Sequence, residues 1–229
     1  MAAVAWLPGT AHKFYEDRYR LLPREVPLVK RQERGELFAV FDGIGGAPKG
    51  REAAQEMSDR LFRFYQYAEL YPASCEGLHK ILMEANLTIF DWGMMPGTNT
   101  PLGGCAGTIA WLFKETLFLY HAGDTIGILV KGDESLVLTR AHEKDNVIYR
   151  YFGLGPKLEI DFSQTAVEEF DRILLISDGV TKAFDPLQAA DLVNTHNDIC
   201  RAATELANRS RALGSQDDIT VLVIEVEGQ

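Results

Sequence analysis

Short runs of apolar and β-branched residues that stop at a glycine or an aspartate constrain this chain more than any other feature of its sequence. Runs of this length, bounded by turn residues, are typical of buried β-strands. Only Lys114 and Glu115 separate two of the runs, which indicates an antiparallel hairpin. The predicted strands are residues 36–41, 108–113, 116–122, 172–177 and 219–226.

Two amphipathic patterns lie between the first and second of these strands. Apolar residues recur every three or four positions over 53–64 and over 78–89, which predicts two helices that are each buried on one face. Asp185, Pro186 and Gln188 have the pattern of a capped helix start, and residues 199–213 suit a longer helix. Hairpins combined with helix pairs predict an α+β fold of antiparallel sheets covered by helices.

The composition limits the classes of protein that this chain can belong to. Its 229 residues, without repeats or long linkers, predict a single domain over residues 1–229. A net charge of −10 argues against nucleic acid and anionic membranes as partners. The N-terminal residues do not resemble a signal peptide. Three scattered cysteines fit a reducing compartment, so we expect a cytoplasmic protein.

Acidic residues at or near strand ends are the candidate functional residues. Unpaired carboxylates at buried strand ends are costly, and several gathered together would repel one another unless cations neutralised them. Oxygen ligands of this kind favour Mg²⁺ or Mn²⁺ over zinc. The acids concerned are Asp42, Asp124 and Asp178, each beside a glycine, with Asp217 before the last predicted strand and Glu16 and Asp17 near the first.

Each of these acids also has a simpler explanation when it is taken alone. An isolated Asp-Gly pair is more often a turn than a metal ligand. Asp124 could cap a turn, Asp217 and Asp218 could form a solvated loop, and Glu16 with Asp17 could begin a helix. Ser177 lacks the GxSxG pattern of a nucleophilic serine, so no covalent serine mechanism is predicted.

Seven short segments follow one another in a set order: 15–17 (YED), 38–46 (FAVFDGIGG), 106–110 (AGTIA), 122–125 (AGDT), 138–142 (LTRAH), 173–179 (ILLISDG) and 216–221 (QDDITV). Most of them match the VFDGxGG, AGTTA, VGDSR, LTxDH, LLxSDG and DNxTV motifs of one family. In this order they resemble the PP2C-like, or PPM, metal-dependent protein phosphatases. The resemblance implies a four-layer α-β-β-α sandwich of two antiparallel sheets flanked by helix pairs.

The resemblance also implies an activity and a metal site. The activity is hydrolysis of phosphoserine and phosphothreonine in proteins by direct attack of a hydroxide that bridges two Mn²⁺ or Mg²⁺ ions. Asp42, Asp178 and Asp217 would form the catalytic centre. By position, Asp42 would bridge the two ions, the Gly43 carbonyl would bind one, Asp178 and Asp217 the other, Glu16 and Asp17 would hold metal-bound waters, and Asp124 would hold a weaker third ion.

Two departures from the family pattern leave alternatives open. The family's phosphate-binding arginine is replaced by His12, followed by Lys13; either could supply the positive charge, or His12 could be a solvated loop residue. The stretch 142–155 is too short for the family's usual flap. A pseudophosphatase that binds phosphoproteins is therefore the alternative, and a small-molecule phosphatase is another. The implied setting is a monomeric bacterial enzyme that opposes a Ser/Thr kinase.

Overall fold

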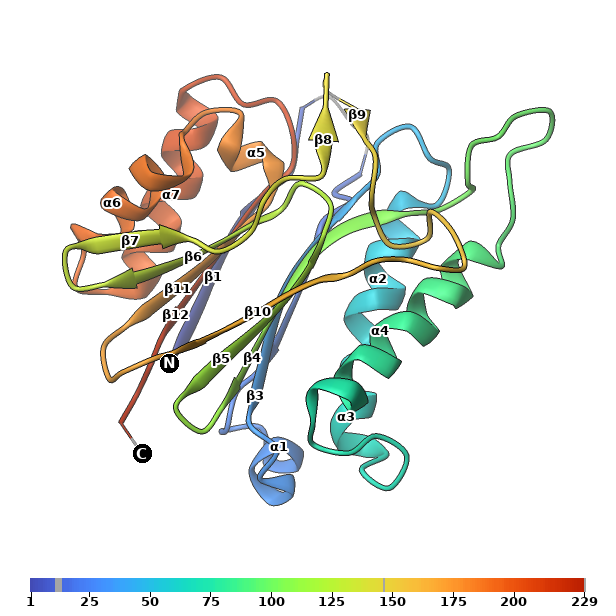
Figure 1. Cartoon of the computed structure of the whole chain (residues 1–229). Helices are drawn as coiled ribbons and strands as arrows, with labels where there is room; N and C mark the ends of the chain where they lie inside the picture. Colours follow the sequence, from blue (N-terminus) through green and yellow to red (C-terminus); the bar gives the residue numbers. More distant parts are fainter. Residues whose placement is uncertain (11–13, 146, 229) are drawn as a thin grey trace.

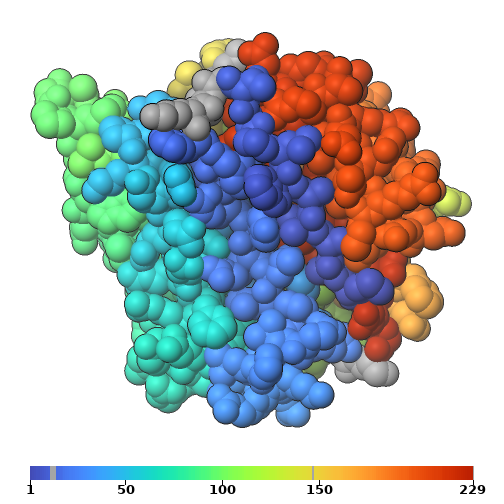
Figure 2. Space-filling view, turned by 180° about the vertical axis from the view of Figure 1, so that it is seen from behind, coloured from blue at the N-terminus to red at the C-terminus, as the bar shows by residue number. Residues whose placement is uncertain are grey.

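The computed structural model describes residues 1–10, 14–145 and 147–228. Two five-stranded antiparallel sheets pack face to face, and helices cover the outer face of each sheet (Figure 1). This arrangement confirms the predicted α-β-β-α sandwich. Seen from behind, the N-terminal segment runs between the half of the molecule that holds α2 to α4 and the half that holds α6 and α7 (Figure 2).

The first sheet contains the predicted hairpin at its centre. Its strand order is β10-β5-β4-β3-β2, and every neighbouring pair is antiparallel. The third strand in the chain begins at the predicted residue but continues to Gly43, so that Asp42 lies within it, opposite Ala106. The strands are β2 (Arg18–Leu22), β3 (Glu36–Gly43), β4 (Cys105–Phe113), β5 (Thr116–Ala122) and β10 (Asp161–Ala166).

The second sheet has the order β1-β12-β11-β6-β7. The sequence patterns predicted only two of these strands, β11 and β12. The N-terminal strand pairs with β12 along its whole length, from Ala2 opposite Ile224 to Leu7 opposite Ile219. The strands are β1 (Ala2–Leu7), β6 (Ile126–Lys131), β7 (Glu134–Val137), β11 (Arg172–Ile176) and β12 (Ile219–Glu225).

The helices fall into two groups, one on each sheet. The predicted helix over 53–64 is two helices, because α2 ends at Arg60 and α3 begins at Arg63. Asp185 and Gln188 form the expected capping box of α6. The first group is α2 (Gly50–Arg60), α3 (Arg63–Gln66) and α4 (Cys75–Phe90), and the second is α5 (Asp178–Thr181), α6 (Pro186–Asn194) and α7 (Ile199–Ala212).

The connection between β2 and β3 contains a short helix, α1 (Pro27–Gln32), that the sequence patterns did not predict. Pro27 occupies the first helical turn, where its missing N–H costs nothing. Glu33, with φ of 49°, ends the helix in the left-handed conformation. A six-residue helix carries too few apolar residues to show a clear periodicity, which explains why the pattern did not reveal it.

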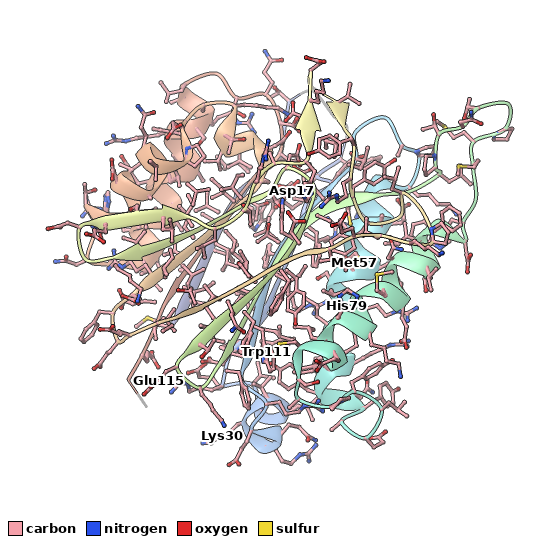
Figure 3. All side chains as sticks on the ribbon, viewed as in Figure 1. Asp17, Lys30, Met57, His79, Trp111 and Glu115 are labelled. Carbon is pink, nitrogen blue, oxygen red and sulfur yellow. The ribbon has the colours of Figure 1, made fainter. Side chains whose placement is uncertain are left out.

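The alternation of side chains along β3 explains where the side chain of Asp42 points. Leu37, Ala39 and Phe41 pack towards the helices, in the core that also holds Met57 and Trp111, whereas Phe38 and Val40 pack between the two sheets. Successive side chains of a strand point to opposite faces, so Asp42 continues the inter-sheet face. Figure 3 shows Asp17 near the end of the sheets where β8 and β9 lie, with Glu115 and Lys30 towards the opposite end.

None of the helices within residues 1–10, 14–145 and 147–228 is long and apolar enough to cross a membrane. The three cysteines that the sequence shows as scattered, Cys75, Cys105 and Cys200, are all free thiols.

Candidate metal centre

The turns that carry the predicted acids meet at one end of the sandwich. They surround a cavity of about 860 Å³, which Asp42, Asp124, Asp178 and Asp217 all line. Gly43, predicted to contribute its carbonyl, lines the same cavity. The structure therefore brings together acids that are as much as 175 positions apart in the chain, between Asp42 and Asp217.

Strand ends deliver three of these acids. Asp42 is the penultimate residue of β3, Asp124 follows β5, and Asp178 follows β11 and opens α5. The fourth acid, Asp217, precedes β12, which pairs with β11, so that it faces Asp178. Gly123 has a φ of +117° and allows the turn that presents Asp124. The site is thus built from strand ends in both sheets: β3 and β5, which flank β4, and the neighbouring strands β11 and β12.

The charge balance of the cavity is unfavourable for carboxylates. Asp42 is accessible only in part, and desolvation, followed by the nearby charges of Asp17, Asp178, Asp124 and Asp217, raises its pKa well above the usual range. Burial, followed by the charge of Asp178, raises the pKa of Asp124 to about 7. Burial and neighbouring negative charge both favour the protonated form of a carboxylic acid. A bound cation would reverse both effects.

Two buried carboxylate oxygens have no hydrogen-bond partner within residues 1–10, 14–145 and 147–228. Asp17 is fully buried; its Oδ2 accepts a hydrogen bond of 2.6 Å from Thr220 Oγ1, but its Oδ1 is unpaired. Asp124 Oδ1 is unpaired as well. Burial raises the pKa of Asp17 to about 8. Orphaned buried oxygens in an acidic cavity fit hard divalent cations such as Mg²⁺ and Mn²⁺.

The acids do not form a complete cage by themselves. In the part of the chain that the structure describes, no group of three or more Asp, Glu, His or Cys side chains is arranged to hold one ion. Backbone carbonyls and water would then complete the coordination, which suits Mg²⁺ because it retains several waters. The predicted roles of the Gly43 carbonyl and of waters held by Glu16 and Asp17 are of this kind.

A lysine that the sequence patterns did not reveal lies between two of the acids. Lys182 Nζ is 2.5 Å from Asp178 Oδ2 and 2.6 Å from Asp217 Oδ2. Burial would lower the pKa of this lysine, but the two carboxylates outweigh it and raise the pKa above its usual value. The spacing of four residues between Asp178 and Lys182 in a helical turn was the only available signal.

Asp218 is a buried structural residue and not part of a solvated loop. Its Oδ1 accepts a hydrogen bond from the Gly9 N–H and its Oδ2 one from the Glu16 N–H, both at 2.5 Å. These bonds fix the N-terminal segment beside β12, so that Glu16 and the buried Asp17 lie at the cavity end of the sheets. The bonding is entirely tertiary, so no local pattern could have predicted it.

Ser177 has a structural role that agrees with the prediction of no serine nucleophile. The residue is fully buried, and its Oγ accepts a hydrogen bond of 2.9 Å from the Thr220 N–H. It joins the ends of β11 and β12 beneath the acids. The predicted phosphate-binding residues His12 and Lys13 lie outside the described residues, so their assignment stays a prediction.

The short stretch after His142 contributes to the cavity, which modifies the expectation that a flap is missing. It forms a small hairpin of β8 (Glu143–Lys144) and β9 (Val147–Ile148) at the end of the sheets (Figure 1). Glu143, Val147, Ile148 and Tyr151 line the cavity. His142 anchors the hairpin, because its N–H donates to the Gly123 carbonyl at 2.7 Å and its Nδ1 accepts from the Gly123 N–H at 3.1 Å.

The raised pKa values of Asp17 and Asp124 predict how the stability of the metal-free protein responds to pH. Asp17 and Asp124, with pKa values of about 8 and about 7, keep protons in the folded state that they lose near pH 4 in the unfolded state. Where the folded state binds more protons, stability falls as pH rises, by up to about 1.4 kcal/mol per group and pH unit. In EDTA, the melting temperature should therefore fall between about pH 6.5 and about pH 9.

The lower limit of this range avoids an opposing contribution. Burial, followed by the charge of His142, lowers the pKa of His121 to about 4, so this histidine reduces stability only as the pH falls below about 6.5. Thermal melts at several pH values, with EDTA and with excess Mn²⁺, test the prediction. Bound Mn²⁺ should remove the fall in melting temperature. An equal fall with pH in EDTA and in Mn²⁺ would contradict the assignment of these acids to a metal centre.

The fold and the site match known proteins. The family model of stage II sporulation protein E (SpoIIE) matches residues 37–227. A relative from Listeria welshimeri, serine/threonine phosphatase stp, is 25% identical over 224 residues, which cover 86% of this chain and 87% of the relative. PppA, a key regulatory component of T6SS in Pseudomonas aeruginosa, superposes with a TM-score of 0.81 at 25% identity, over 97% of this chain and 96% of its own. The PPM Ser-Thr phosphatase MsPP from Mycobacterium smegmatis, in complex with cacodylate, superposes with a TM-score of 0.79 at 23% identity, over 99% of this chain and 98% of its own.

Two facing antiparallel sheets with clustered acids at one end define the class of metal-dependent phosphatases. The chain belongs to the SpoIIE family of PP2C-like phosphatases, as a compact bacterial-type PPM member. It is a protein serine/threonine phosphatase that depends on divalent metal ions, and its substrates are phosphoproteins. Relatives that match most of its length are named phosphatases, which does not favour the pseudophosphatase alternative.

Proposed function

We propose that the acid cluster binds two Mn²⁺ or Mg²⁺ ions and that phosphoserine and phosphothreonine are hydrolysed there. The observation that carries the proposal is a pair of buried carboxylate oxygens, on Asp17 near Asp42 and on Asp124 in the cavity lining, that have no hydrogen-bond partner among the described residues. Such oxygens are costly unless cations bind them. The bound ions would supply neutralisation of the phosphate charge and activation of a water molecule.

The proposed ligand roles are those that the resemblance to the metal-dependent phosphatases implies for these residues. Asp42 would contact both ions, the Gly43 carbonyl would contact one of them, and Asp178 and Asp217 would contact the other. Glu16 and Asp17 would hold coordinated waters, and Asp124 would hold a third, weaker ion. Asp218 and Ser177 contribute by fixing the segments that carry these ligands. His12 or Lys13 would supply positive charge to the substrate phosphate.

Hydrolysis of a phosphothreonine peptide with Mn²⁺ tests the proposal. Asp178→Asn should lower the rate by about 100-fold or more, because loss of partners outside the ligand shell alone costs 10- to 100-fold in metal sites. A wild-type rate no higher than that of this variant would contradict the proposal. A much faster reaction on small phosphate metabolites than on peptides would instead favour the small-molecule alternative.

The setting of the enzyme is also a proposal. We infer a single domain over residues 1–229, a monomeric state and opposition to a Ser/Thr kinase. Relatives match this chain over most of their own length, which supports the single domain. The free thiols of Cys75, Cys105 and Cys200 suit the cytoplasm. Size-exclusion chromatography with light scattering tests the monomeric state.

A further inference from the structure

We propose that Lys182 is an internal counter-cation of the metal centre, which bridges Asp178 and Asp217 when no ion is bound to them and is displaced when an ion binds. The inference rests on the proposed role of these two aspartates as ligands of one ion. It concerns the order and strength of metal binding, which the family assignment leaves open.

The position of the ammonium group carries the inference. Its distances of 2.5 and 2.6 Å to one oxygen of each aspartate are those of charge-assisted hydrogen bonds. Among the described residues that line the cavity, Lys182 is the only lysine or arginine. It therefore occupies one carboxylate oxygen of each aspartate that the proposed ion would use.

The two aspartates lie on different segments of the chain, so the lysine bridge between them has a structural effect. Asp178 opens α5, whereas Asp217 lies 39 positions later in the turn before β12. Two like charges facing each other would push these segments apart, and the ammonium removes that repulsion. We therefore expect Lys182 to hold the pair of ligands together in the metal-free protein.

The side chain of Lys182 can also move away from the two aspartates. It is 49% exposed, against 21% for Asp178 and 25% for Asp217, so the far side of the ammonium faces solvent. A flexible four-carbon stem lets the charged group move into water without rearrangement of the backbone. An arriving dication must nevertheless break two charge-assisted bonds, so the lysine should weaken binding of that ion.

Binding of Mn²⁺ to the metal-free enzyme, measured by isothermal titration calorimetry and by electron paramagnetic resonance, tests this role. Lys182→Met removes the charge and keeps the length of the side chain. The Mn²⁺ site at Asp178 and Asp217 should bind its ion about tenfold or more tightly in this variant than in the wild type, because one competing cation is lost. The number of bound ions should stay the same, and the melting temperature in EDTA should fall.

Two variants sharpen the comparison. Lys80→Met removes the same charge from an exposed pair with Glu84 on α4 and should leave Mn²⁺ affinity unchanged. If Lys182→Met does not fold, Lys182→Gln, which also removes the charge, provides the same measurement of Mn²⁺ binding. Equal or weaker Mn²⁺ binding by both Lys182 variants would overturn the counter-cation role alone. Failure of the wild type and of both variants to bind Mn²⁺ would overturn the proposed metal centre itself, and the counter-cation role with it.

Discussion

An Asp42→Asn enzyme is expected to lose about 1,000-fold or more of its Mn²⁺-dependent turnover and yet to melt at a higher temperature than the wild type in EDTA. The loss follows from the proposed bridging role, since charge stabilisation by metal ions contributes several kcal/mol and each 1.36 kcal/mol is tenfold in rate. The gain in stability follows from the environment of the same carboxylate.

Desolvation and four neighbouring aspartates make the charged form of Asp42 unfavourable, and they raise its pKa. Asparagine has the same shape without the charge, so the folded metal-free protein should be stabilised. The melting temperature should rise by about 2–4 °C for each kcal/mol gained. A substitution that simply damages the fold would lower activity and melting temperature together, so opposite changes make the pair of measurements discriminating.

Asp133→Asn is the matched control, because Asp133 is exposed in the turn between β6 and β7. It should change neither the turnover nor the melting temperature in EDTA by a measurable amount. An Asp42→Asn variant that melts at or below the wild-type temperature in EDTA would show that the carboxylate is not strained there. Retained turnover would refute its role at the metal ions.

Strands with long apolar runs were the ones that the sequence could predict. The runs that became β3, β4, β11 and β12 lie between two layers and are buried on both faces, so almost every residue in them is apolar. By contrast, β10 alternates half-buried and exposed residues and contains Ser163, Gln164 and Thr165. Its pairing with β5, and not its composition, makes it a strand.

The residues of the candidate site also divide into those that local sequence could predict and those that depend on distant partners. The acids next to glycine were predictable because the Asp-Gly turn and the preceding strand are adjacent in the chain. Asp218 and Lys182 were missed because their partners are distant in the sequence: Gly9 and Glu16 for the aspartate, and Asp217 for the lysine. A hydrogen-bond partner more than 30 positions away has no local signature, and only the fold reveals it.

Gly179→Ala is expected to be the most damaging of the small substitutions near the site. A Cβ atom at this position would lie 1.9 Å from the Asp218 carbonyl oxygen and 2.8 Å from the carbonyl carbon, a contact that real Cβ atoms essentially never make. Because the obstacle is backbone, a rotamer change cannot relieve it. The start of α5 would have to move away from the turn before β12.

That movement would separate Asp178 from Asp217 and disturb the bonds of Asp218 to the N-terminal segment. Overpacking of this kind costs about 1–3 kcal/mol and occasionally more, which corresponds to a fall of roughly 2–12 °C in melting temperature. Glycine-to-alanine changes at unstrained positions stabilise proteins by about 0.4–1 kcal/mol instead, so the expected sign is the reverse of the usual one. Mn²⁺ affinity should fall together with stability.

Gly155→Ala is the matched control, because a Cβ atom there meets nothing within 4 Å and the carbonyl that accepts a hydrogen bond from Asn86 is retained. Thermal melts and Mn²⁺ titrations of the two variants separate the close contact from the general effect of adding a methyl group. If Gly179→Ala matched Gly155→Ala in both measurements, α5 would not be packed against the Asp218 carbonyl. The arrangement that brings Asp178 and Asp217 together would then need another explanation, since this contact fixes the distance between the two segments that carry them.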